Sequence, residues 1–415
     1  MNPILHRILR TIVRHGQFAI IDAAGDRHTF GDGTGPAHTI RFHEASAARA
    51  LVGNPELTLG ESYMNGLWSV EEGDLTSLLV MLMKNHHAAG SSAVQRGLRM
   101  LLRRFQQHNT ARAARRNAQS HYDVGNDIYR LFLDEDWQYS CAYFPHFDMT
   151  LEDAQRAKKR HIAAKMLLEP GQTVLDIGCG WGGMGLYLAQ QTGAHVTGIT
   201  LADNQVTYAN ERAAGEPNAT FRVQDYRAVE ESFDRIVSVG MFEHVGVGYY
   251  DEYFQTAARI LKDDGVMLLH SIGRTDGPGT TNPFIARYIF PGGYIPSLSE
   301  VLPAVERAGL IVTDVEILRL HYAETIKHWR ARFLAHWDKV VELRSETFAR
   351  MWDFYLAGSE AAFRTGDMMV FQMQLAKRID KVPLTRDYIT SAERSLANRD
   401  SGRPAPPPAL VARHG

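Results

Sequence analysis

The sequence predicts an α/β protein with a doubly wound, mostly parallel sheet of seven strands, a helical lid insertion and a small α+β amino-terminal domain. Two observations predict this fold class. From residue 169 onward, five short apolar runs alternate with helical patterns, and two further strand-like segments follow. Such alternation is typical of a parallel sheet with helices on both faces. Residues 1–90 lack it, because their apolar pieces are short and separated by Gly, Asp and Pro.

The composition excludes several classes of protein. The 415 residues include 45 Lys and Arg against 47 Asp and Glu, and 45% are hydrophobic, as in an ordinary globular chain. No run of 18 apolar residues is present, so we expect no transmembrane helix. Two cysteines, Cys141 and Cys179, cannot form a disulfide framework, which favours the reducing cytoplasm. We therefore expect a soluble enzyme, and contact with a membrane surface stays open.

The amino-terminal domain, residues 1–90, begins with a basic amphipathic pattern. Its apolar residues share one helical stripe: Ile4, Leu5, Ile8, Leu9, Ile12 and Val13. Arginines accompany them, and no acid precedes Asp22. The helix either packs on its own domain or lies in the interface of an anionic bilayer, and both interpretations stay open. Two strands joined by a Gly/Asp turn are expected in residues 16–33, and a helix in residues 75–83.

Composition also defines two segments outside the folded domains. Residues 91–118 are a predicted linker helix, within which residues 96–116 hold seven arginines and no acid. This segment is either a solvated linker or a patch that binds lipid phosphates through guanidinium groups. The Pro-rich residues 396–415 are predicted to be a disordered tail.

The domain between these segments, residues 119–395, carries the predicted sheet. Strands are expected at residues 173–180, 195–200, 220–226, 233–240, 266–273, 311–319 and 369–375. A long helical insertion at residues 323–363, rich in Trp, Phe and Met, precedes the last strand. It either covers a tunnel for an acyl chain or belongs to the core.

A glycine turn after the first of these strands predicts a ligand site. Gly178 and Gly180 follow Asp176, so the backbone can approach a ligand closely at the point where a helix begins. Further candidates follow the second and third strands: Thr200, Leu201, Gln205, Asp225 and Tyr226. A dinucleotide-binding enzyme would instead place an acid at the end of the second strand. The ordered set resembles the S-adenosylmethionine-dependent methyltransferase fold, which implies S-adenosylmethionine as the cofactor.

Longer motifs indicate one family of these methyltransferases. Upstream of the glycine turn, the segment AQSHYDVGNDIYRLFLDEDWQYSCAYF ends at Phe144. Downstream, the motifs are EHVG from Glu243, LHSIG from Leu269, FPGGYIPS from Phe290 and HYAET from His321. Together they resemble the cyclopropane-fatty-acyl-phospholipid synthase family, which includes the mycolic acid cyclopropane synthases. The resemblance covers residues 117–380 and extends over the amino-terminal domain.

The resemblance implies transfer of a methylene group from S-adenosylmethionine to a cis double bond in an acyl chain of a membrane phospholipid. An isolated alkene is a poor nucleophile, so the site has to be oriented and dry. The resulting carbocation closes to a cyclopropane ring when the added methyl group loses a proton. In the family bound bicarbonate is the base, and the resemblance implies these holders for it: Cys141, Glu243, His270, Tyr322 and the Ile272 backbone. Tyr139 and Ser140 match positions that contact the cofactor.

Several alternatives remain at this point. Each base-site residue has a purely structural interpretation, such as a buried thiol or a core histidine. Trp137 stands where the family has Met before QYSCAYF, which leaves the acyl preference open. The product is a cyclopropane or, alternatively, a methyl-branched or methyl-olefinic chain. A non-catalytic peripheral lipid-binding protein and a nucleic-acid methyltransferase are the rival functions.

The resemblance and the composition also give expectations about partners. Unsaturated phospholipid in a bilayer is the expected substrate, and the family analogy favours a homodimer. We expect no nucleic-acid partner, because the net charge of −2 gives no overall attraction, and no metal site. The expected location is the cytoplasm, with peripheral attachment to the inner face of the membrane.

Overall fold

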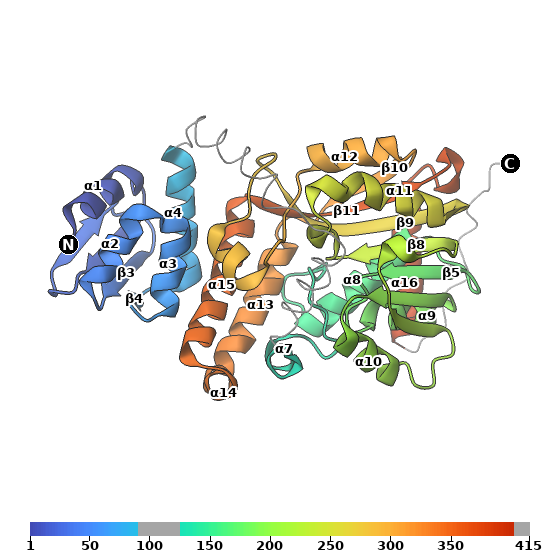
Figure 1. Cartoon of the computed structure of the whole chain (residues 1–415), viewed down its shortest axis with the longest axis horizontal. Helices are drawn as coiled ribbons and strands as arrows, with labels where there is room; N and C mark the ends of the chain where they lie inside the picture. Colours follow the sequence, from blue (N-terminus) through green and yellow to red (C-terminus); the bar gives the residue numbers. More distant parts are fainter. Residues whose placement is uncertain (90–124, 402–415) are drawn as a thin grey trace.

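The computed structural model describes residues 1–89 and 125–401, which form a small amino-terminal domain and a larger domain around a central sheet (Figure 1). The predicted linker helix at 91–118 and the start of the motif that ends at Phe144 lie outside the described residues. The predicted tail is described only up to residue 401. Its first residues are helical, contrary to the prediction, because α16 (Asp387–Asp400) continues through them. Leu396 is buried, and the Asp400 carboxylate forms an ion pair of 2.8 Å with Arg160. These two contacts hold this end of the helix.

Within residues 1–89, four strands form a mixed sheet in the order β2-β1-β3-β4. The strands β1 and β2 pair antiparallel, which confirms the predicted hairpin, whereas β1 and β3 run parallel. The elements are α1 (Pro3–Ile12), β1 (Gln17–Ile21), β2 (Arg27–Phe30), β3 (Ala37–Phe42), α2 (Ala45–Gly53), α3 (Pro55–Met64), β4 (Trp68–Glu72) and α4 (Leu75–Ala89).

The first helix, α1, packs on its own domain. Asn2 caps it, since its side-chain oxygen accepts from the backbone N–H groups of Ile4 and Leu5. Leu5 and Val13 are buried in the core of the domain, whereas Ile4 is 58% exposed. Packing on its own domain therefore accounts for part of the apolar stripe of α1. The end of the stripe near Ile4 faces outward.

In the described part of the larger domain, seven strands form one sheet in the order β10-β11-β9-β8-β5-β6-β7. All neighbours from β9 to β7 run parallel, and β11 lies antiparallel between β9 and β10. The predicted seven-stranded, mostly parallel sheet is thus confirmed. The strands are β5 (Thr173–Ile177), β6 (His195–Thr200), β7 (Ala219–Val223), β8 (Phe233–Val239), β9 (Leu261–Arg274), β10 (Ile311–Ile317) and β11 (Met368–Ala376).

Helices cover both faces of this sheet, as the alternation of strands and helices predicts. One face is covered by α8 (Leu151–Lys165), α9 (Gly183–Thr192), α10 (Asp203–Arg212) and α16. The other face is covered by α11 (Tyr250–Ile260) and α12 (Leu298–Arg307). Successive side chains of β5 point to opposite faces of the sheet. Val174 therefore belongs to the core beneath α8, α9, α10 and α16, and Leu175 to the core beneath α11 and α12.

The predicted helical insertion consists of three helices. They are α13 (His321–Ala335), α14 (Trp337–Leu343) and α15 (Glu346–Thr365). The Ser345 side chain accepts from the backbone N–H of Phe348 and so starts the last of them. Together with α7 (Asn126–Phe132), these helices enclose an aromatic core that contains Trp329, Phe333 and Trp352. This core lies beside the sheet and closes one side of the site described below.

The amino-terminal domain packs against α15 through α3 and α4 (Figure 1). At the interface, Asp353 of α15 accepts a hydrogen bond of 2.7 Å from the Tyr63 hydroxyl and another of 2.7 Å from Arg330. Arg330 also pairs with Asp74 of the amino-terminal domain at 2.7 Å. The buried Asp353 therefore joins the two domains. Over residues 1–89 and 125–401, every helix is too short or too polar to cross a membrane.

Candidate active site

A pocket opens at the carboxyl ends of β5, β6, β7 and β8, where parallel strands of this fold direct their ligands. All the residues predicted to contact a cofactor line it: Tyr139, Ser140, Asp176, Gly178, Gly180, Thr200, Leu201, Gln205, Asp225 and Tyr226. These positions are spread over almost ninety residues of the sequence, and the sheet brings them to one edge. The cofactor contacts themselves remain predictions.

The glycine turn is shaped by close backbone contacts. The backbone N–H groups of Gly178 and Cys179 both donate to the carbonyl of Ile199, at 2.9 and 3.0 Å. Gly178 has a φ of +81°, and a Cβ atom there would lie only 2.6 Å from the Cβ atom of Met241. Only glycine fits this position without displacing Met241. The glycine therefore lets the turn pack closely against Met241, beside the pocket.

Two buried polar atoms in the pocket have no hydrogen-bond partner among the described residues. Asp176 is 1% exposed, and its Oδ2 atom has no hydrogen-bond partner in the described structure. Burial raises the pKa of Asp176 to about 7, because the charged carboxylate is poorly solvated. The Gln205 Oε1 atom accepts from the Thr200 hydroxyl at 2.9 Å, and its Nε2 atom finds no partner among the described residues. An acceptor and a donor are thus open to a ligand with amino and oxygen groups, as S-adenosylmethionine has.

Asp225 is engaged with Arg227 at the far end of the pocket. Its carboxylate accepts two hydrogen bonds from the guanidinium group of Arg227, at 2.9 and 2.7 Å. The remaining lone pairs of this carboxylate can still accept from a ligand, because a carboxylate has about four acceptor positions. The neighbouring Tyr226 ring lies 5.4 Å from the same guanidinium. A ligand that bonds to Asp225 would therefore share its carboxylate with Arg227.

A buried lysine that the sequence analysis missed supports the opposite wall. Lys158 is 0% exposed, and its Nζ atom donates to Gln138 Oε1 at 2.5 Å and to Ser140 Oγ at 2.9 Å. Gln138 and Ser140 both line the pocket. Burial lowers the pKa of Lys158 to about 8. Nothing near Lys158 in the sequence marks it as functional, since it lies on α8 among other charged residues.

Trp137, the departure from the family pattern, also lines this pocket. Its ring stacks on Tyr208 with centroids 4.5 Å apart, and its backbone has a φ of +55°, which is rare for a bulky residue. The position at which this chain differs from the family motif therefore lies at the predicted cofactor pocket.

Glu243 lies beside the pocket, in the short turn η2 (Phe242–His244) after β8. Its neighbours Met241 and His244 line the pocket. The Glu243 Oε1 atom accepts from the backbone N–H of Ile272 at 2.6 Å, and Oε2 is without a partner within the described chain. Burial raises the pKa of Glu243 to about 7, so the carboxyl group holds a proton at higher pH than an ordinary glutamate does.

His270 stands two residues before Ile272 on β9, and therefore on the same face of the strand. Its backbone carbonyl accepts from Gly240 at 2.9 Å, and its ring Nδ1 atom lies 3.2 Å from Nε2 of Gln372. His270 is 2% exposed, and burial keeps its pKa far below the ordinary value. The imidazole is therefore neutral.

Cys141 and Tyr322 belong to the same aromatic core, with Ile272 packed at its edge. The Ala142 backbone N–H donates to the hydroxyl of Thr325 at 3.0 Å, which ties the loop that carries Cys141 to the first turns of α13, where Tyr322 lies. Cys141 is 1% exposed, and burial raises the pKa of its thiol, so the thiol stays protonated.

The structure thus links the five predicted base-site residues through three separate sets of contacts. Glu243 and Ile272 are bonded directly, His270 follows on the same strand face, and Cys141 and Tyr322 are linked through neighbouring residues. The Ile272 N–H, expected to face an anion, is already engaged by Glu243.

The sheet, the glycine turn and the pocket at its carboxyl edge define an S-adenosylmethionine-dependent methyltransferase. Comparison with known proteins specifies the family. Residues 108–373 match the family described as mycolic acid cyclopropane synthetase, and residues 5–93 match a domain of unknown function, DUF7884. The chain belongs to the mycolic acid cyclopropane synthetase family.

The relatives agree with this assignment. A cyclopropane-fatty-acyl-phospholipid synthase of Escherichia coli K12 is 37% identical over 84% of this chain and 90% of its own length. The solved cyclopropane synthase MmaA2 from Mycobacterium tuberculosis is 36% identical, with a TM-score of 0.61 over 63% of this chain and 98% of its own. The mycolic acid cyclopropane synthase CmaA1, solved with SAH and CTAB, is 37% identical, with a TM-score of 0.60 over 63% of this chain and 97% of its own.

Proposed function

We propose that the protein transfers a methylene group from S-adenosylmethionine to the cis double bond of unsaturated acyl chains in membrane phospholipids, which gives cyclopropane fatty acyl chains. The observation that carries this proposal is the Glu243 carboxyl group. It is buried beside the cofactor pocket, has a pKa of about 7 and holds one oxygen without a protein partner in the described chain. The similarity to the Escherichia coli synthase over 90% of that enzyme supports the choice of a phospholipid substrate.

The surroundings of the site suit a carbocation reaction. S-adenosylmethionine, when bound, supplies the methyl group as an electrophile. The aromatic core around Trp329 and Trp352, both at most 1% exposed, excludes water that would trap a cation. Aromatic faces also carry negative partial charge, so they stabilise a positive charge nearby. The chain thus provides a dry and electron-rich wall next to the pocket.

The predicted base-site residues fit a small anion in their protonation states. Bicarbonate, when bound, supplies a base for the last proton transfer. Its proposed holders are the side chains of Cys141, Glu243, His270 and Tyr322 and the backbone of Ile272. The protonated thiol of Cys141 and the neutral imidazole of His270 can each donate a hydrogen bond without adding a charge. The near-neutral pKa of Glu243 lets it share a proton with an anion at the same place.

Access to the bilayer is proposed through the amino-terminal domain, at the inner face of the cytoplasmic membrane. The exposed side chains of Ile4, Arg7 and Arg10 on α1 combine an apolar group with positive charge, which favours an anionic lipid surface. A homodimer would present two such surfaces and raise the avidity for vesicles.

The test is incubation of the full chain with S-adenosylmethionine and phospholipid vesicles that carry cis-monounsaturated acyl chains. We expect release of S-adenosylhomocysteine that depends on vesicles and is unaffected by RNA, and upfield ring-methylene signals in the proton NMR spectrum of the product lipid. Vinyl signals with a branch methyl would overturn the cyclopropane product in favour of a methyl-olefinic one. Absence of S-adenosylhomocysteine with any unsaturated lipid would overturn the enzymatic function.

A further inference from the structure

His270 has a partner on the neighbouring strand that no motif identifies. Gln372 of β11 lies directly opposite His270 of β9 in the antiparallel register. The Gln372 Nε2 atom lies 3.2 Å from His270 Nδ1, and both residues are at most 2% exposed. The imidazole therefore has one ring nitrogen in a fixed protein contact, while Nε2 is on the other side of the ring.

The orientation of the Gln372 amide is fixed by a lysine. Lys165, the last residue of α8, donates from Nζ to Gln372 Oε1 at 2.8 Å. An ammonium group can only donate, so the oxygen of the amide has to face Lys165 and the NH2 group has to face His270. Because the NH2 group can only donate, His270 Nδ1 has to accept.

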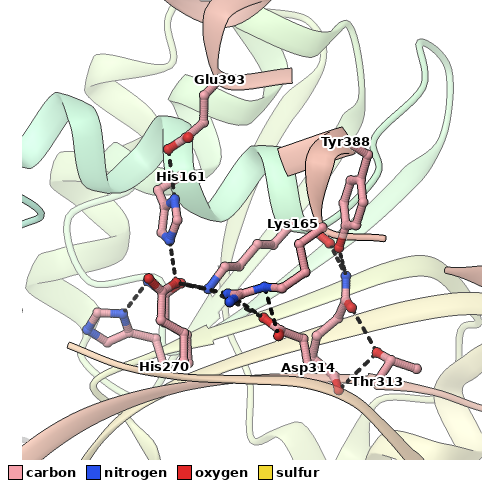
Figure 2. A network of polar contacts seen from close by, with 11 residues as sticks. His161, Lys165, His270, Thr313, Asp314, Tyr388 and Glu393 are labelled. Carbon is pink, nitrogen blue, oxygen red and sulfur yellow. Dashed lines mark hydrogen bonds and ion pairs between the residues drawn. The ribbon is translucent and has the colours of Figure 1, made fainter. Parts of the chain in front are cut away.

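Lys165 is itself held by a buried ionic network, which Figure 2 shows with His270 at its edge. The Lys165 ammonium pairs with Glu316, which also accepts from His161 at 2.7 Å. His161 bonds Glu393 through its other ring nitrogen at 2.7 Å. Asp314 lies 3.9 Å from the Lys165 ammonium. Burial lowers the pKa of Lys165, and these carboxylates oppose that effect because they stabilise the ammonium form.

From these contacts we propose that Gln372, oriented by Lys165, is a positioning residue that holds His270 as the tautomer with its proton on Nε2. The inference rests on the proposed function, because the Nε2–H group is then the donor that His270 offers to the anion. The opposite tautomer would place two N–H donors against each other at the Gln372 contact. A neutral histidine with a single fixed tautomer is a permanent donor, which suits a site that has to hold a base without protonating it.

The decisive variant is Gln372→Glu, which keeps the shape of the side chain. The new carboxylate can still pair with Lys165, and it can only accept from His270, so the proton should move to Nδ1. The matched control is Gln374→Glu, two residues along β11. Gln374 is equally buried and bonds the Lys165 carbonyl and the Tyr388 hydroxyl, so its replacement loses comparable contacts. It leaves the partner of His270 unchanged.

The readout is ¹⁵N NMR of the full chain labelled at histidine, with the His270 signals assigned by their loss in His270→Gln. We expect a protonated Nε2 in the wild-type protein and in Gln374→Glu, and a protonated Nδ1 in Gln372→Glu. Turnover should fall about tenfold or more in Gln372→Glu alone, at unchanged affinity for S-adenosylhomocysteine, since a wrong tautomer of a functional histidine is costly.

Three results would overturn the inference: a protonated Nδ1 in the wild-type protein, an unchanged tautomer in Gln372→Glu, or a changed tautomer with turnover equal to that of the control. If Gln372→Glu does not fold, Lys165→Met decides, because loss of the ammonium should give a mixture of both tautomers, and a pure Nε2 tautomer would contradict the role of Lys165. Failure of the proposed function is distinct: the wild-type protein would form no ring-containing lipid while His270 still carried its proton on Nε2.

Discussion

Glu243 and Ile272 are joined by a hydrogen bond of 2.6 Å, in which the backbone N–H of Ile272 donates to the Glu243 carboxylate. The bond connects the turn after β8 to the end of β9, next to the pocket at the carboxyl edge of the sheet. It fixes one carboxylate oxygen, and the other is buried with no hydrogen-bond partner in the described chain. Glu243 is therefore positioned from one side and free to act from the other.

Replacement of Glu243 by Gln tests this arrangement. The amide oxygen can still accept from Ile272, but the group can no longer exchange a proton. We expect turnover to fall by about 10²-fold or more, as for loss of a general acid or base, with little change in the affinity for S-adenosylhomocysteine. Steady-state assays and calorimetric titration measure the two quantities, and Glu306→Gln on the exposed face of α12 is the control. Unchanged turnover would remove Glu243 from the mechanism.

The same variant should change how stability depends on pH. The pKa of Glu243 is about 7 in the folded protein and 4.5 as the ordinary value, so between these pH values the folded state binds more protons than the unfolded state. The free energy of unfolding of the wild-type protein should therefore decrease as the pH rises from 4.5 to 7, by on the order of 3 kcal/mol from this group. Urea unfolding at pH 5 and pH 8 should show a smaller decrease for Glu243→Gln. Equal decreases for both proteins would contradict the raised pKa.

Gln205 offers a test of the cofactor pocket that is independent of chemistry. Its Nε2 atom has no partner among the described residues, and Gln205→Leu removes this donor at similar volume. We expect the dissociation constant for S-adenosylhomocysteine to rise about tenfold, since one hydrogen bond to a buried group contributes on the order of 1 kcal/mol or more. Isothermal titration calorimetry measures the change. Thr207→Val, on the exposed side of the same helix, should bind as the wild type does; equal affinity of Gln205→Leu would place Gln205 outside the cofactor site.

The domain interface depends on the buried Asp353. Its side chain is 3% exposed and pairs with Arg330 at 2.7 Å. Arg330→Met should lower the free energy of unfolding by about 3–5 kcal/mol, because it leaves a buried carboxylate without its cation. Denaturant unfolding measures this loss, and Asp353→Asn in the Arg330→Met background should restore part of it. Lys339→Met, which breaks an exposed pair with Glu342, should change stability by less than about 1 kcal/mol.

Membrane attachment through α1 is tested with Arg7→Gln combined with Arg10→Gln. Both side chains are exposed, and each basic residue near an anionic surface contributes about 1 kcal/mol. Sedimentation with anionic vesicles should show weaker binding of the double variant at low salt, and wild-type binding should weaken as salt increases. Binding that depends neither on the two substitutions nor on salt would assign vesicle attachment to another part of the chain.

The sequence predicts the sheet and the pocket because both have local signals. Each strand is an apolar run with its own boundary, and the residues at the strand ends, such as Asp176 and Gln205, meet because parallel strands share one edge. The sequence does not show where the helical insertion divides into α13, α14 and α15, since the aromatic pattern continues through the breaks. The predicted tail starts too early, at residue 396, because the order of Leu396 and Asp400 depends on contacts with distant residues.

The supporting residues of the site have no comparable signal. Lys158 and Gln372 are a lysine on a charged helix and a glutamine on an alternating strand, and each acquires its importance only from a partner far along the chain. Ser140 lies 18 residues from Lys158, and His270 lies 102 residues from Gln372. Motifs identify the groups that touch ligands, whereas the groups that hold them in place emerge from the three-dimensional packing.

Ala357 and Ala361 of α15 are completely buried in the core of the amino-terminal domain. Methyl groups at these positions let the two domains approach closely, and a longer side chain would hold them apart. These two alanines, four residues apart on one face of α15, therefore set how closely the two domains of this chain approach each other.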